Sequence, residues 1–176
     1  VVALYRSYKK VILHDSDIEK GNAKMSAFMI QMQVIYTALM AGMMLMYTIT
    51  LGRYFDYILK HKIPGASQNW ALFHNNTRVQ IHHTAVLVGH AMLSIISLAT
   101  NYTRGPAPLV VAAAVPFLML TTHMVTGFAK AEFFVNGAQR LDDEKTVKTY
   151  LAWNMPLHIT YTLLYAVSAA LLLTLL

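Results

Sequence analysis

The chain has 176 residues, of which 56% are hydrophobic and only 12% are charged. Soluble domains carry about 25% charged residues, so this chain has about half the usual supply with which to cover a surface exposed to water. The composition excludes a disordered chain and an ordinary soluble enzyme. Because the chain has no cysteine, it also excludes a disulfide scaffold, a Cys-ligated zinc site and an iron–sulfur cluster.

The N-terminal residues 1–24 mix apolar side chains with Arg6, Lys9 and Lys10, and we predict a short helix there that lies on the membrane surface. Four long apolar stretches follow, each long enough for a helix to cross a bilayer, which takes about 20 residues. We predict membrane spans at about 27–51, 79–102, 107–129 and 150–176.

The connections between these spans are predicted to be a long loop over residues 52–78, a tight turn over 103–106 and a second long loop over 130–149. The apolar stretches are continuous rather than alternating, which favours helices over transmembrane strands. We therefore predict a single all-α domain over 1–176. It would be a multi-pass integral membrane four-helix transmembrane bundle with a short N-terminal interfacial helix, in a membrane that the sequence does not specify.

The net charge of +6 comes from basic residues that flank the apolar stretches. This arrangement is typical of membrane anchoring, and we expect no nucleic acid partner. Little of the chain lies outside the spans, so it has no room for a substrate-oxidising domain of its own. We expect lipid and the other subunits of a membrane complex as partners.

Histidine is the most informative residue type in the predicted spans. His83 and His90 lie in the second span, His123 in the third and His158 in the fourth. Because a tight turn joins the second and third spans, residues at equal depth in the membrane have numbers that add to about 209. The depth of His123 therefore falls between the depths of His83 and His90. The histidine of the fourth span falls close to the same depth. We predict that imidazoles from three helices meet at one level.

Buried neutral imidazoles in a chain without thiolates favour b-type haem, whose iron takes one histidine from each of two helices. Such a chain would be an electron-transfer subunit of an oxidoreductase complex rather than an enzyme alone, with no catalytic residue of its own. The predicted cofactor-binding residues are His83, His90, His123 and His158, and the candidate metal ligands among them are His90, His123 and His158.

Two other interpretations fit the same residues. A membrane copper site would use His83, His90, His123 and one of the methionines of the first span, since imidazole and thioether suit copper. A non-redox structural subunit of a large membrane complex would instead use the histidines for hydrogen bonds between helices or for contacts with lipid.

Two segments are similar to known families. The segment Thr122-His123-Met124-Val125-Thr126-Gly127, an H-x-x-x-G pattern, resembles the haem-ligand helix in the cytochrome b anchors of succinate dehydrogenase and fumarate reductase. The resemblance implies haem b ligation by His123, a second ligand from His90 or His83, and quinone chemistry with a flavoprotein and iron–sulfur partner. Separately, Trp153-Asn154-Met155-Pro156 resembles the end of a small four-helix membrane family tied to maturation of haem-copper oxidases.

Overall fold

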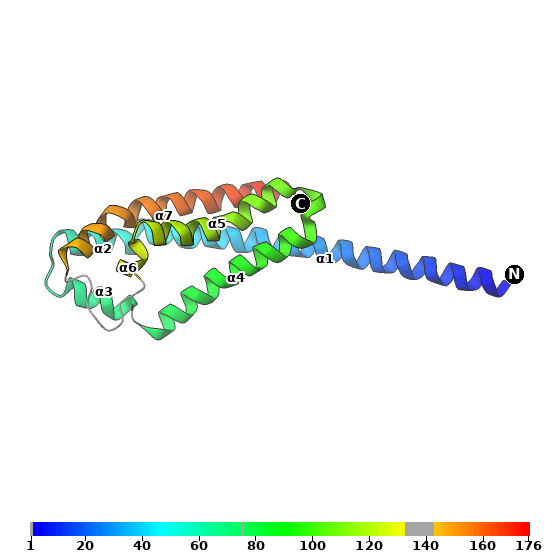
Figure 1. Ribbon diagram of the computed structural model, residues 1–176, viewed down its shortest axis with the longest axis horizontal. Helices are drawn as coiled ribbons and strands as arrows, with labels where there is room; N and C mark the ends of the chain where they lie inside the picture. The colour runs from blue at the N-terminus through cyan, green and yellow to red at the C-terminus, as the bar shows by residue number, and fades with distance from the viewer. Residues whose placement is uncertain (1, 75, 133–142) are drawn as a thin grey trace.

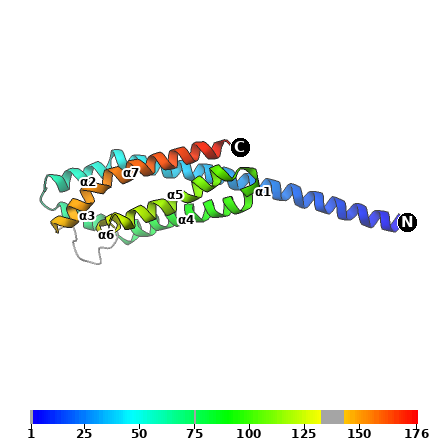
Figure 2. The ribbon, with the colours of Figure 1, turned by 45° about the horizontal axis from the view of Figure 1, so that its top comes forward.

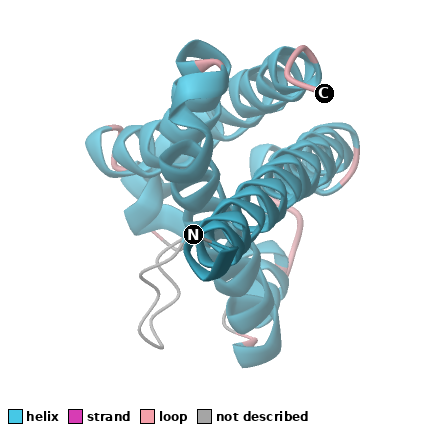
Figure 3. Cartoon of the chain, turned by 90° about the vertical axis from the view of Figure 1, so that its right-hand side faces the viewer, coloured by secondary structure: helices cyan, strands magenta, loops and turns pink. Residues whose placement is uncertain are grey.

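The structure, a computed structural model, describes residues 2–74, 76–132 and 143–176. These described residues form helices joined by turns and contain no strand (Figure 3). In chain order the elements are α1 (Val2–Ile49), α2 (Leu51–Lys60), α3 (Ala66–His74), α4 (Thr77–Asn101), the 3-10 turn η1 (Tyr102–Arg104), α5 (Pro106–Val125), α6 (Phe128–Glu132) and α7 (Glu144–Leu173).

Four helical segments of the described chain are long and apolar enough to cross a membrane, as the sequence predicts. They pack as a four-helix bundle, in which α1 lies along α7 and α5 lies against both α4 and α7 (Figures 1 and 2). The segments are Ala23–Lys60, Thr77–Arg104, Pro106–Val125 and Glu144–Leu173.

The N-terminal residues differ from their prediction. They do not form a separate interfacial helix but the first part of α1, which runs without interruption into the first span and projects beyond the bundle (Figure 1). The segment contains no proline and only one glycine, Gly21, so nothing in it ends the helix. A single glycine inside a helix costs only about 1 kcal/mol relative to alanine.

The predicted loop over 52–78 is also wrong, because α2 and α3 occupy most of it. Helix α2 continues α1 after a kink at Thr50, whose amide still bonds to the Met46 carbonyl at 3.0 Å. The Thr50 hydroxyl bonds to the same carbonyl, an arrangement that commonly bends helices. Beyond the kink, the apolar residues of α2 recur at helical spacing and are buried; they are Phe55, Ile58 and Leu59.

The third and fourth spans have ends that local chemistry explains. Helix α5 stops at Val125 because Gly127 adopts a φ of +74°, a left-handed conformation that favours glycine. Helix α7 begins at Glu144, before the predicted start of the fourth span, because the Asp143 side chain accepts bonds from two backbone amides of the first turn. Residues 133–142 of the predicted second loop lie outside the described residues.

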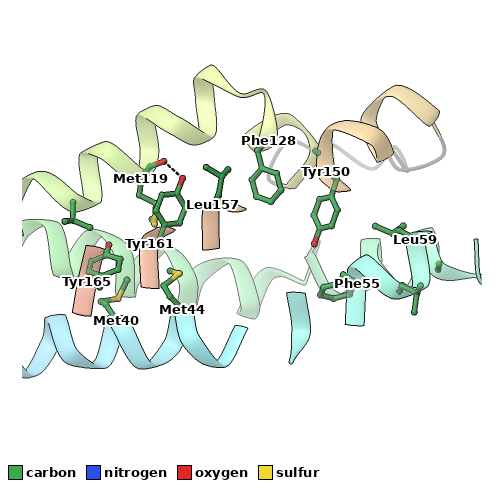
Figure 4. Packing of buried hydrophobic residues seen from close by; sticks show 14 residues of the cluster. Met40, Met44, Phe55, Leu59, Met119, Phe128, Tyr150, Leu157, Tyr161 and Tyr165 are labelled. Atoms are coloured by element: carbon green, nitrogen blue, oxygen red, sulfur yellow. Dashed lines mark hydrogen bonds between the residues drawn. The ribbon is translucent and has the colours of Figure 1, made fainter. Parts of the chain in front are cut away.

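Helix α4 is inclined to the other three, and its N-terminal end stands apart from them (Figure 1). Its C-terminal end turns tightly through η1 into α5, as predicted for 103–106. Leu109, Ala112 and Leu172 form a buried cluster near this end. The main apolar core lies between α1, α2, α5, α6 and α7 and is built around aromatic and methionine side chains (Figure 4).

Candidate functional site: the histidine cavity

A cavity of about 500 Å³ lies between the N-terminal half of α4 and the facing surfaces of α1, α5 and α7. Its volume falls within the range of pockets that hold cofactors and small ligands. This is the end at which α4 inclines away from the bundle in Figure 1. We call it the histidine cavity, because three imidazoles line it: His83 from α4, His123 from α5 and His158 from α7.

The three imidazoles share one hydrogen-bond geometry. In each, Nδ1 lies close to the carbonyl oxygen of the residue one turn earlier in its own helix. The distances are 2.9 Å from His83 to Val79, 2.9 Å from His123 to Met119 and 2.7 Å from His158 to Asn154. A carbonyl only accepts, so Nδ1 carries the proton in each ring. In a neutral imidazole Nε2 is then the basic nitrogen, and this is the arrangement in which histidines ligate metals.

His123 is buried, with 5% of its surface exposed, and is held mainly by α7. The Tyr161 ring stacks on it with the ring centroids 5.3 Å apart, and the Tyr161 hydroxyl lies 3.0 Å from Nδ1. The same hydroxyl contacts the Thr122 hydroxyl. It also donates to the Met119 carbonyl, as Figure 4 shows. Tyr161 therefore fixes the orientation of His123. Tyr161 is not among the site residues predicted from the sequence, although it lies three residues after His158 on one helix face.

His158 is 6% exposed, and its ring centroid lies 6.4 Å from that of His123, which agrees with the predicted common depth. The Tyr47 ring of α1 stacks on His158 with the centroids 4.0 Å apart. The Tyr47 hydroxyl donates to the Asn154 side-chain oxygen at 3.1 Å and also lies 3.1 Å from the Tyr150 hydroxyl. This aromatic side chain joins α1 to the histidine of α7.

Asn154 anchors this arrangement from α7. It is fully buried, and its amide nitrogen donates to the Gly52 carbonyl at 3.1 Å and to the Asp56 carboxylate at 2.7 Å. The kink at Thr50 brings α2 into reach of these bonds. In the sequence, this asparagine stands out only as part of the segment Trp153-Asn154-Met155-Pro156, which resembles a known family. Its bond to an acid about a hundred residues earlier leaves no local pattern in the chain.

His90 does not line the histidine cavity. It is fully buried one layer further along α4, where Nε2 lies 3.1 Å from the Thr37 hydroxyl of α1. The rings of Tyr36 and Tyr165 contact it from α1 and α7, with centroids 5.5 and 5.2 Å away. The structure therefore brings together three of the four predicted cofactor-binding histidines. The fourth occupies a separate contact between helices.

Methionines from two helices supply much of the apolar lining of the cavity. They are Met43, Met44 and Met46 from α1 and Met119 from α5. Among the described residues, no three histidine, aspartate or glutamate side chains gather closely enough to hold a metal ion by themselves. The cavity therefore combines dispersed imidazoles with a soft, polarisable lining.

Comparison with known protein families, with curated proteins and with solved structures gave no match for this chain.

Proposed function

We propose that the chain is an integral membrane subunit that binds haem b in the histidine cavity and transfers electrons to partner subunits. The observation that supports the proposal is the common Nδ1 geometry of His83, His123 and His158 around one cavity. Haem is favoured over a bare ion because the porphyrin supplies four of the ligands to iron and leaves only one or two to the protein.

The residues that would hold the group are His83 on the α4 wall and His123 on the α5 wall of the cavity. Helix α5 packs against both α4 and α7, but α4 inclines away from the bundle toward its N-terminal end, and His83 lies in that half of α4. Tyr161 orients His123 through its stacked ring and its hydroxyl. When bound, haem b would supply one-electron transfer, and the four methionines would give it an apolar surface on the α1 and α5 sides.

The test is absorbance of the purified full chain, expressed with an adequate haem supply, before and after reduction with dithionite. We expect a b-type α-band in the reduced protein and iron in proportion to the chain. Replacement of His123 or His83 by alanine removes the band, whereas His82→Ala, a change to the exposed neighbour outside the cavity lining, preserves it. Circular dichroism checks that each variant keeps its helices. Absence of the band from the wild-type chain would refute the proposal.

A copper site is the second candidate, because four methionine thioethers line the same cavity as the histidines. Metal analysis of the same sample separates the two candidates. Copper without porphyrin would favour the copper site. A sample with neither metal would leave the histidines a structural role within a larger membrane complex.

A further inference from the structure

The buried residues of α4 are all polar, although the helix as a whole is apolar. They are His90, Ser94, Ser97 and Asn101, which we call the inward polar face of α4. Their spacing of four, three and four residues places them along one side of the helix. Polar groups within a membrane span are costly, and those that occur face a partner or water.

Helices α1 and α7 carry buried polar groups as well. Gln33 and Thr37 of α1 are fully buried, and so is Ser168 of α7. Tyr165, one turn before Ser168 on the same side of α7, places its ring against His90. Thr37 of α1 and Tyr165 of α7 thus contact the inward polar face directly, through His90.

Most of these groups have no hydrogen-bond partner within the protein. Unpartnered atoms include both polar atoms of the Gln33 side chain, Nδ1 of His90 and the Tyr165 hydroxyl. The hydroxyls of Ser94, Ser97 and Ser168 are unpartnered too. An unsatisfied polar group buried in a protein costs about 1–3 kcal/mol, and internal water is the usual partner of such groups.

The buried serines of α4 differ from exposed threonines of the same bundle in the hydrogen bonds of their hydroxyls. Hydroxyls of threonines in apolar helices commonly bond to their own helix, and here Thr100 and Thr160 bond to the carbonyls four residues earlier, at 2.9 and 2.8 Å. The hydroxyls of Ser94 and Ser97 make no such bond, although suitable carbonyls exist. They are therefore available to groups inside the bundle.

We propose that the inward polar face of α4 lines a chain of internal water that leads from one end of the bundle toward the histidine cavity and carries protons. The entrance is the pair Ser26–Asn101, whose side chains hydrogen-bond to each other, and Ser26 lies two residues after the exposed Lys24 of α1. The titratable groups that face the path are His90 and Tyr165. At its inner end, His90 lies one turn from Leu87, which lines the cavity.

Proton movement along this path is balanced at every step. Each water or hydroxyl takes one proton from the preceding group and releases one to the next, and His90 takes a proton on one ring nitrogen and releases one from the other. No oxidant or reductant is needed. The proposal goes beyond haem binding and does not depend on it, because it concerns the α1, α4 and α7 layer outside the cavity.

The chain lacks cysteine, so single cysteines can report on water along the path. Methyl methanethiosulfonate is small and neutral, and it reacts with the thiolate, which forms only where water and proton exchange are available. Ser94→Cys and Ser97→Cys change little in size. Ala99→Cys places a thiol on the exposed, lipid-facing side of α4 and is the matched control. Intact-mass spectrometry of the full chain in lipid nanodiscs measures the rate.

We expect Ser94→Cys and Ser97→Cys to react at least tenfold faster than Ala99→Cys, with rates that rise about tenfold per pH unit below the thiol pKa of about 8.5. Reaction at the Ala99→Cys rate, or without pH dependence, would overturn the proposal. Asn101→Leu, combined with Ser94→Cys, should slow the reaction at least fivefold, and an unchanged rate would overturn the assigned entrance. If either serine variant fails to fold, Ser168→Cys on α7 provides the same test.

Discussion

Replacing Asn154 by alanine should destabilise the protein more than any other single polar change in α7. The substitution removes a donor to the Gly52 carbonyl and to the Asp56 carboxylate, and it removes the acceptor of the Tyr47 hydroxyl. The alanine cannot replace any of these bonds. The lost contacts all join α7 to the kinked α1–α2 segment.

The magnitude follows from the number and kind of bonds. Interhelical hydrogen bonds in membrane proteins contribute about 0.6 kcal/mol each on average, so three of them give roughly 2 kcal/mol. The bond to the Asp56 carboxylate is charge-assisted, and such bonds contribute up to about 3 kcal/mol. We therefore expect Asn154→Ala to lower the free energy of unfolding by about 2–4 kcal/mol.

The assay is unfolding of the full chain in mixed micelles with increasing mole fraction of dodecyl sulfate, followed by circular dichroism. Thr160→Ala is the control, because that exposed hydroxyl bonds only to the Pro156 carbonyl of its own helix. It should change stability by less than about 0.5 kcal/mol. A double-mutant cycle with Asp56→Ala isolates the carboxylate bond. An Asn154→Ala loss no larger than that of the control would refute this reasoning.

Three further predictions test the helix junctions. Gly52→Ala should cost about 1–3 kcal/mol in the same unfolding assay, because the new β-carbon would lie 2.8 Å from Tyr47 Cε1. Gly42→Ala is the control and should be neutral or stabilising, because no atom lies within 4 Å of its β-carbon. Equal changes in the free energy of unfolding for the two variants would contradict the close contact at Gly52. Gly127→Ala should lower the free energy of unfolding by about 1–2 kcal/mol, because the φ of Gly127 is +74°. Gly127→Asn should cost less, because asparagine tolerates this left-handed conformation better than alanine. If neither variant lost stability, the left-handed turn would be contradicted. The bond from the Thr146 hydroxyl and those from nearby backbone amides lower the pKa of Asp143 below its ordinary value of 3.8. Its stabilisation is therefore present above pH 3.8 and is lost as the pH falls through the folded-state pKa, so hydrogen exchange at the start of α7 should become less protected in acid in the wild type but not in Asp143→Asn. Equal pH dependence in the two proteins would contradict this role.

The sequence predicted the four apolar helical segments well, because span length and continuous hydropathy depend only on local composition. It also predicted the turn near Gly105 and the proximity of His123 and His158, since both follow from counting residues along antiparallel helices. It missed α2, because charged residues such as Arg53 and Asp56 hide its apolar face when hydropathy is averaged.

Counting residues along the helices could not predict that His83 lines the cavity and His90 does not. The two histidines are seven residues apart and share one face of α4, as expected. Helix α4, however, is inclined to the bundle, and His83 in its N-terminal half lines the cavity, whereas His90 is buried against Thr37 and two tyrosines. Helix inclination depends on packing over the whole bundle and has no signature in a single span. The polar contacts of Asn154 are equally non-local.

We propose that His83 and His123 hold one haem in the histidine cavity. The most direct measurement is titration of haem into the purified haem-free chain in nanodiscs, followed by absorbance. We predict saturation at one haem per chain with a bis-histidine b-type spectrum, loss of saturable binding in the His83→Ala/His123→Ala double variant, and wild-type binding in His82→Ala. Non-saturable uptake by the wild type, or saturable binding of the same strength in the double variant, would contradict the claim.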